Sequence, residues 1–398
     1  MQRLLALLLT IWTLPADGEP WLSNRFAQNC AGCHDTGRPN RPVLDRRCTL
    51  SCQGCHVNPN GGGLRSTYGK WSEKWLTLLR DDREPGTEST RMGHTALGSE
   101  FLESIPPGDP YHTRRSTTIE AGGDIRYLRT DENSFLMATT FGLRWKTLDR
   151  VSVVFEPQMF GRPKTDPWAL RPVDGSAYIL VDDLPLNTFI MSGRYRPLFG
   201  LATPDHTSLP ARIFAEAATG SPRSQGLLFR ATTIGLAPNV PYFNLHVIDG
   251  DSGALEDGGD VRSGVAFNTG LRFVSAGLSF QYSWWRTGEA PALTTMEAID
   301  VGAQIWRFTL NYQWLSAGRY GSPVTLDAEA QEVRVRLRTW REAYVETTWE
   351  TQEIRTDRPV VTPQRLRYGV RLFPWPGLDL RLTTGGDGQW LSEVHLYF

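Results

Sequence analysis

The sequence predicts an all-β fold: a transmembrane antiparallel β-barrel of about 16 strands, preceded by a small and partly helical segment. From about Thr117 to Phe398, segments of roughly ten residues alternate apolar and polar positions and are separated by turn residues. The connections between these segments alternate between short and long. Aromatic residues make up 11% of the chain, with 14 Trp, as expected for a barrel with interfacial aromatic girdles.

The first 18 residues have the pattern of a secretory signal peptide. Arg3 precedes the apolar run from Leu4 to Leu14, and Ala16 and Gly18 form a small-residue cleavage site. The run is shorter than the roughly twenty residues that a membrane-spanning helix needs. Because no longer apolar run follows and the mean hydropathy is −0.34, we expect an exported protein and not a helical membrane protein.

Composition and charge exclude several classes of function. The formal net charge is −1, so there is no electrostatic footprint for nucleic acid. No hydrolytic triad, P-loop or dinucleotide-binding fingerprint stands out. We expect a mature chain in three parts: a segment over 19–105, a linker over 106–115 and a barrel over 116–398.

All five cysteines fall between positions 30 and 55, and four of them form two C-x-x-C-H motifs. In such a motif two thiols form thioethers to haem vinyl groups, and the following histidine ligates the iron. The motifs therefore predict two covalent c-type haems, attached through Cys30, Cys33, Cys52 and Cys55, with His34 and His56 as the proximal ligands.

Two other readings of these cysteines stay open. Eighteen residues separate the two pairs, which also fits a four-thiolate zinc site. Such a site has no use for a histidine after each pair, whereas haem attachment requires one at both places. A disulfide framework is the third interpretation, but it fits poorly with two adjacent C-x-x-C pairs and an odd number of cysteines. Cys48 belongs to neither motif, and we expect it to be either a buried apolar residue or a redox-sensitive thiol.

The residues after the second motif are predicted to lie close to the haems. The turn-rich segment 57–63 lets backbone approach a macrocycle. An aromatic stripe at helical spacing follows and predicts an amphipathic helix that covers haem or packs a small core; it comprises Leu64, Tyr68, Trp71, Trp75 and Leu79.

An electron-transfer haem usually has a sixth iron ligand, from His or Met. His94 and His112 are the first candidates because they lie in or beside the cytochrome segment. Met92 is an alternative, and His206 is another if its loop folds inward.

Proline-rich residues 106–110 separate this segment from the predicted barrel. The clearest alternating segment is 333–338, where Val and Leu occupy one face and Arg the other. Segments 277–284 and 365–372 repeat the pattern. A soluble β-sandwich also alternates, so loop length has to discriminate between the two folds.

Loop length favours the barrel, because bacterial barrels have short periplasmic turns and long outer loops. The predicted short connections are 147–150, 184–187, 237–239 and 374–377. The predicted long ones are 161–175, 198–225, 250–260 and 317–329. This rhythm predicts that both termini are periplasmic.

Three features of the barrel sequence suggest functional roles. Lumen-facing arginines would pair with haem propionates or form an ordinary charged porin wall; they are Arg334, Arg336, Arg338, Arg367 and Arg371. The 198–225 connection is expected either to fold inward as a constriction or to stay on the surface. An acidic outer loop would collect cations or be solvated; it carries Asp249, Asp251, Glu256, Asp257 and Asp260.

Haem motifs just after a signal peptide, followed by a barrel of about 16 strands, resemble the fused cytochrome-porins of the outer membrane, which are typified by iron oxidases. The familiar members carry one haem motif and this chain carries two. The resemblance implies electron passage between periplasmic c-type cytochromes and an extracellular donor or acceptor, such as iron, with outer-membrane lipid around the barrel. The alternatives are a passive porin with a haem-containing gate or plug, and a haem peroxidase.

Overall fold

The computed structural model describes residues 119–131, 133–148, 150–162, 166–184, 188–200, 208–220, 228–236, 242–250, 261–273, 278–321, 325–340, 343–355, 364–374, 378–385 and 388–397. The predicted signal peptide, cytochrome segment and linker lie outside these residues. So do all the predicted haem and iron ligands, namely Cys30, Cys33, Cys52, Cys55, His34, His56, His94, His112, Met92 and His206.

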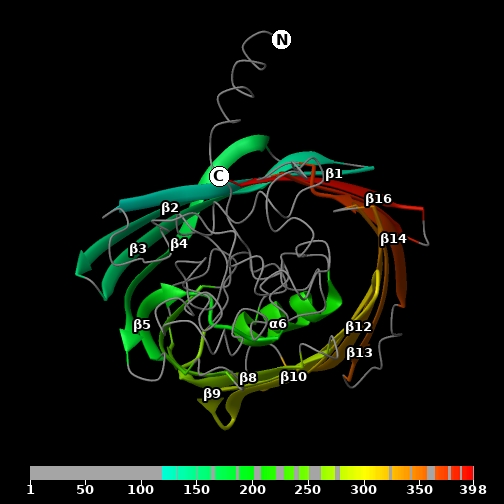
Figure 1. Ribbon diagram of the computed structural model, residues 1–398. Helices are drawn as coiled ribbons and strands as arrows, with labels where there is room; N and C mark the ends of the chain where they lie inside the picture. The colour runs from blue at the N-terminus through cyan, green and yellow to red at the C-terminus, as the bar shows by residue number, and fades with distance from the viewer. Residues whose placement is uncertain are drawn as a thin grey trace.

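Sixteen antiparallel strands form a closed barrel, which confirms the predicted fold class for this part of the chain (Figure 1). Each strand pairs with its neighbours in sequence, and β1 pairs with β16 to close the barrel. The strands are β1 (Ile119–Thr130), β2 (Ser134–Leu148), β3 (Val151–Arg162), β4 (Asp166–Leu184), β5 (Thr188–Tyr195), β6 (Phe229–Leu236), β7 (Tyr242–Asp249), β8 (Gly264–Phe273), β9 (Leu278–Glu289), β10 (Ala292–Ile305), β11 (Phe308–Arg319), β12 (Leu326–Trp340), β13 (Ala343–Ile354), β14 (Arg365–Leu372), β15 (Leu378–Gly385) and β16 (Trp390–Tyr397).

The two ends of the barrel differ in the length of their connections. One end carries only short connections: 149–150, 185–187, 237–241, 274–277, 306–307, 341–342 and 373–377. The start of β1 and the end of β16 lie at this same end, because the strands alternate in direction. The other end carries the long connections 196–228, 250–263 and 355–364. All four predicted short connections fall at the short end.

Two of the predicted long loops are wrong in extent. Residues 161–175 lie mostly in β3 and β4, which pair from Val151↔Val181 to Arg162↔Asp166. Residues 317–329 contain the end of β11 and the start of β12, so that connection spans only 320–325. In both places turn-forming residues occur within a strand, where inter-strand hydrogen bonds override their local preference.

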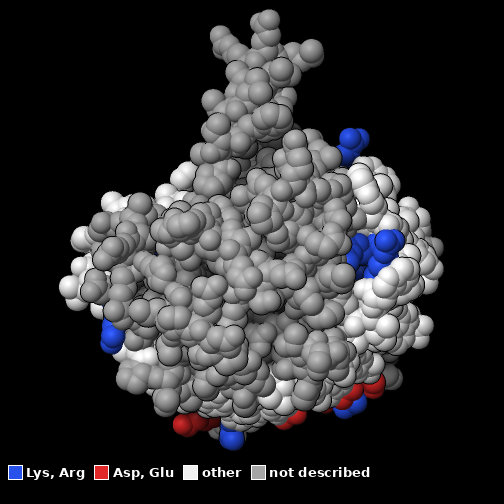
Figure 2. Space-filling model, in the orientation of Figure 1, with Lys and Arg blue, Asp and Glu red and all other residues white. Residues whose placement is uncertain are grey.

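The outer wall of the barrel is apolar. Along most strands, side chains that face the lumen are less exposed than the outward-facing ones with which they alternate; in β12, buried residues alternate with partly exposed ones from Leu326 to Arg336. Among the exposed outward residues are Phe155, Ile179, Val335, Val345 and Leu382. Figure 2 shows few charged atoms on the flanks formed by the described residues. Such a surface is expected to face lipid.

A single described helix, α6 (Leu209–Thr219), lies inside the ring of strands, on the connection between β5 and β6 (Figure 1). Ser208 has extended backbone angles, Pro210 lies in the first turn, and Gly220 ends the helix with φ 77°. Proline suits a helix start and a left-handed glycine suits a helix end. Of the two expectations for the 198–225 connection, inward folding is therefore observed. No helix among the described residues has the length and apolarity to cross a membrane.

Candidate functional site in the barrel lumen

One face of α6 packs on an aromatic cluster of the barrel wall. The ring of Phe214 stacks on Phe199, with centroids 4.9 Å apart. Trp285 of β9 meets Phe199, Phe214 and Phe229 edge to face, at 5.1 to 6.1 Å. Trp285 is fully buried, and its indole N–H donates to the Thr287 hydroxyl at 3.2 Å. Aromatic pairs of this kind stabilise beyond the area that they bury, so this cluster fixes the helix against the wall.

Small side chains on the wall make room for the helix. α6 contacts β10, β11, β12 and β13. The lumen-facing positions at the long-loop ends of β11 and β12 include Ala317, Ala328 and Ala330, each at most 1% exposed. Farther along β12 the same face carries Glu332 and Arg334. The sequence of β12 thus changes from small to charged where the helix begins.

The chain that leads into α6 is held by β9. The N–H of Gly200 donates to the Ser283 hydroxyl at 3.0 Å, and the Gln281 amide donates to the Gly200 carbonyl at 2.7 Å. Gly200 has φ 60°, and a Cβ there would lie 2.8 Å from the Gln313 side chain. Glycine adopts this left-handed conformation without steric cost, and its lack of a Cβ leaves the Gln313 amide in place.

Two wall carboxylates hold the N-terminus of α6. The Ser208 hydroxyl donates to Glu332 Oε2 and the Leu209 N–H donates to Glu350 Oε1, both at 2.9 Å. Ser208 makes no side-chain cap bond within its own helix. The acceptors therefore come from β12 and β13, and their negative charge complements the positive end of the helix dipole.

The C-terminus of α6 meets a cation. Arg319, at the end of β11, is fully buried and donates from Nη1 to the Ala217 carbonyl at 3.0 Å. Gly220 lies beside it, so that a Cβ at position 220 would be 3.1 Å from the guanidinium. Charges of the appropriate sign thus hold both ends of the helix.

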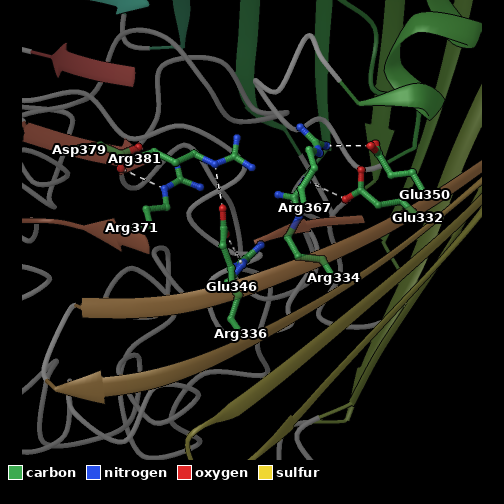
Figure 3. Close-up of polar contacts among 9 residues, drawn as sticks. All are labelled: Glu332, Arg334, Arg336, Glu346, Glu350, Arg367, Arg371, Asp379 and Arg381. Atoms are coloured by element: carbon green, nitrogen blue, oxygen red, sulfur yellow. Dashed lines mark hydrogen bonds and ion pairs between the residues drawn. The ribbon is translucent and has the colours of Figure 1, made fainter. Parts of the chain in front are cut away.

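The wall formed by β12 to β15 is lined with ion pairs, which form two groups in Figure 3. The first, here called the helix-end group, consists of Glu332, Arg334, Glu350 and Arg367. Arg334 pairs with Glu332 at 2.7 Å, and Arg367 pairs with Glu350 at 3.0 Å. The two carboxylates that hold α6 therefore also bind arginines.

The second group lies nearer the short-connection end of the strands. Glu346 pairs with Arg381 at 2.8 Å and with Arg336 at 3.6 Å (Figure 3). Arg371 makes a bidentate pair with Asp379. These side chains are at most 9% exposed. Two-point guanidinium–carboxylate contacts fix both partners in orientation.

The predicted lumen arginines are therefore in the barrel interior, but four of them already bind carboxylates of the wall. Arg334, Arg336, Arg367 and Arg371 make ion pairs, as described above. Sequence reasoning missed the acidic partners. They were detectable, because Glu346 and Glu350 share the β13 face with Tyr344 and lie across from β12 and β14.

Two barrel histidines are buried in hydrogen-bond networks. The Tyr195 hydroxyl lies 2.5 Å from Thr233 Oγ1, which lies 2.6 Å from His246 Nδ1. On β16, His395 Nε2 accepts from Arg126 Nε of β1 at 3.2 Å, across the closure of the barrel. Both histidines thus tie strands and segments of the wall together.

The predicted acidic outer loop is described only in part. Asp249 pairs with Arg230 at 3.7 Å, and both side chains are exposed. The other four acidic residues lie outside the described residues. Within the described ranges, no group of three or more His, Cys, Asp or Glu side chains is arranged to hold a metal ion.

The sequence matches no protein-family model and no curated protein. The fold is similar to solved porins. OmpF of Salmonella typhi, in complex with daunomycin, has a TM-score of 0.52 at 9% identity, covering 70% of this chain and 97% of that one. OmpT of Vibrio cholerae has a TM-score of 0.48 at 9% identity, and the match covers 71% of this chain and 99% of OmpT. An anion-selective porin from Comamonas acidovorans has a TM-score of 0.46 at 9% identity, and the match covers 70% of this chain and 99% of that porin. At this identity the likeness to OmpF shows a porin-like barrel fold.

Proposed function

We propose that this chain is an outer-membrane electron-transfer protein. In this proposal it carries two c-type haems on residues 19–105 and passes electrons between periplasmic c-type cytochromes and an extracellular donor or acceptor such as iron. The observation that carries the proposal is the occurrence of two C-x-x-C-H motifs in one chain with a closed, porin-sized barrel.

The donor set of the two motifs fits haem. Cys30, Cys33, Cys52 and Cys55 supply four thiols for thioethers, and His34 and His56 supply one imidazole each for iron. Bound haem iron would supply reversible one-electron chemistry. His94, His112, Met92 and His206 remain the candidates for the sixth ligand.

The barrel supports the proposal through its two surfaces. Its apolar outer wall suits the hydrocarbon layer of an outer membrane. Its inner wall is polar and charged, and α6 narrows the lumen. Residues 19–105 join the barrel at the start of β1, the end that also carries the short connections. Short turns are periplasmic in bacterial barrels, so both termini are assigned to the periplasm and the cytochrome segment meets periplasmic partners.

Reconstitution into liposomes with an internal redox dye tests the proposal. External ferrous iron or dithionite should change the redox state of the trapped dye through the haem-loaded protein. The matched control, with Cys30, Cys33, Cys52 and Cys55 changed to Ala, should leave the dye unchanged. A haem-loaded protein that also leaves the dye unchanged contradicts electron transfer across the membrane. Replacing His34 or His56 should abolish one haem signal each.

A passive porin is the second candidate, because the fold is similar to OmpF and α6 lies in the lumen as a constriction. This candidate predicts solute flux through the four-cysteine variant at the rate of the haem-loaded protein. Electron transfer predicts that dye reduction is lost in that variant whatever the solute flux.

A further inference from the structure

The turn between β10 and β11 carries an unusual residue for its conformation. Ile305 pairs with Phe308, so Trp306 and Arg307 form a two-residue hairpin turn at the short-connection end. Such turns favour Gly, Asn and Asp, because they need positive φ. Trp306 has φ 53° and is the one non-glycine residue with positive φ among those that the structure describes. Because a bulky side chain is uncommon in this conformation, its presence indicates a role for the ring.

The same turn is highly exposed. Ile305 and Trp306 are each 73% exposed. Within the described ranges, the five large apolar side chains with the highest exposed fractions all lie at the short-connection end; they are Ile119, Leu148, Ile305, Trp306 and Trp340. Apolar side chains that lie next to one another and are this exposed mark a contact with a membrane or with another protein.

The turn continues the outward, apolar wall of the barrel. On β10, Val301 and Ile305 are exposed on the outward side, whereas Gly302 and Gln304 are buried on the inward side. β11 leaves the turn with Phe308 exposed on the outward side. The surface expected to face lipid therefore runs without a break to the tip of the hairpin. This continuity favours lipid over a protein that would contact the tip alone.

The position of Glu297 sets the level of the turn in the membrane. Glu297 is exposed on the outward side of β10, and the outward positions from 299 to 305 are all apolar. A charged side chain is costly on the lipid face, so Glu297 belongs at one edge of the hydrocarbon layer. Trp306 is nine residues farther along. At about 3.4 Å per residue and a tilt of about 40°, this stretch crosses about 23 Å, close to the apolar band of about 25 Å in such barrels. Trp306 therefore lies at the opposite edge.

Arg307 gives the turn a positive charge. Its Cζ is 5.1 Å from the centroid of the Trp306 ring, and its Nη1 donates to the Thr339 carbonyl at 3.4 Å. The Arg338 N–H donates to the Arg307 carbonyl at 2.9 Å, so the neighbouring hairpin supports the turn. Arg307 forms no ion pair with any residue that the structure describes. Tryptophan rings are suited to the headgroup level of a membrane, and a guanidinium binds phosphate well.

We propose that the turn 305–308 lies in the headgroup layer of the membrane, with the Trp306 ring among the headgroups and Arg307 bound to a phospholipid phosphate. The membrane contact offsets the unfavourable conformation of Trp306. This inference goes beyond the proposed function and does not depend on haem. A protein that covers the turn would also explain its exposed apolar side chains, so the test has to separate lipid, protein and water.

The position of the turn is tested with introduced cysteines in the full, haem-loaded chain with Cys48→Ser, the variant without an added cysteine giving the background rate. The protein is placed in lipid nanodiscs of phosphatidylethanolamine and phosphatidylglycerol, where both faces of the bilayer are open to reagents. For each variant, the labelling rate with a lipid-soluble maleimide is divided by the rate with a charged, water-soluble one. This ratio should be about tenfold higher for Trp306→Cys than for Glu289→Cys, because the apolar reagent partitions into the bilayer.

Glu289 is the matched control, because it is exposed at the other end of the β9–β10 pair. Ile305→Cys has ordinary strand geometry and should give the same high ratio if Trp306→Cys folds poorly. An equal ratio at positions 306 and 289 overturns the inference. If both reagents also react slowly at 306, a protein covers the turn; if both react fast, the turn projects into water.

Arg307→Gln tests the phosphate contact. In native mass spectrometry after release from the same nanodiscs, the natural chain should retain about one phospholipid more than Arg307→Gln, whereas Arg307→Lys should retain most of it. Arg355→Gln is the matched control, since Arg355 is exposed but already pairs with Glu329 and Glu353. Equal numbers of bound phospholipids in the natural chain and in Arg307→Gln overturn the phosphate contact.

Discussion

The two sides of the lumen hold their contents by different means. On the β9–β12 side, the aromatic cluster around Trp285 and the small residues of β11 and β12 hold α6 by shape and apolar burial. On the β12–β16 side, ion pairs between neighbouring strands line the wall. Aromatic contacts hold the helix through ring packing and buried area, whereas paired charges hold neighbouring strands through directed hydrogen bonds. Glu332 and Glu350 belong to both sides, because they bind α6 and the arginines.

Trp285→Ala should have the largest effect on stability, because it removes the ring that contacts Phe199, Phe214 and Phe229. We expect a loss of about 3–5 kcal/mol in the free energy of unfolding, as for other buried Trp→Ala changes, measured by urea titration in detergent micelles. Ion selectivity should change little. Trp306→Ala is the control, since Trp306 is 73% exposed. Equal losses of unfolding free energy in the two variants would contradict the conclusion that apolar packing around Trp285 holds α6 in the lumen.

Glu350→Gln should affect both sides of the lumen. The change removes the charge that pairs with Arg367 and weakens the bond from the Leu209 N–H. The expected loss is about 1.5–3 kcal/mol, the range for hydrogen bonds to charged groups, with a shift toward anion selectivity in planar bilayers.

Glu353→Gln is the matched control for this change. Glu353 is on the same strand, and its side chain is 57% exposed beside Arg355. An exposed pair contributes about 0–1 kcal/mol, so this variant should leave stability and selectivity nearly unchanged. If the two variants behave alike, the wall carboxylate does not hold the helix.

Gly220→Ala should have an intermediate effect. The left-handed conformation costs a non-glycine residue about 1–2 kcal/mol, and the new Cβ would lie 3.1 Å from the Arg319 guanidinium. Gly388→Ala measures the conformational cost alone, because φ is 81° there and nothing lies within 4 Å. The difference between the two losses in unfolding free energy reports the Arg319 contact. Equal losses would mean that the guanidinium moves freely.

Glu216→Gln should have the smallest effect, and a pH-dependent one. Burial raises the pKa of the Glu216 carboxyl, and Arg212 opposes the shift. The folded state therefore binds a proton that the unfolded state has lost, and stability falls as pH rises through this range. The variant should be slightly more stable than the natural chain at pH 7 and no different at low pH. A gain that persists at low pH would exclude the carboxyl charge as its cause.

Much of the barrel could be predicted because strand alternation is a local property. The apolar and polar faces of 333–338 and 365–372 follow from the period of two in the sequence. The turn residues in the four predicted short connections indicate the barrel end that carries only short connections. The limits of β3 and β4 were not predictable, because pairing across strands extends them through residues that favour turns locally. The inward position of α6 was left open, since the composition of a loop does not show whether the lumen offers a surface for a helix to pack on. That surface combines residues from β9, β11, β12 and β13.

By itself the sequence determined the number of strands, which face of each is apolar, and a pair of C-x-x-C-H motifs ahead of the barrel. Only the tertiary structure decided which charges meet. The partners of Arg381 and Arg367 come from β13, and those of α6 from residues more than a hundred positions away. The physical reason is range: alternation is set by each residue and its chain neighbours, whereas an ion pair depends on barrel closure and register, which are properties of all sixteen strands together.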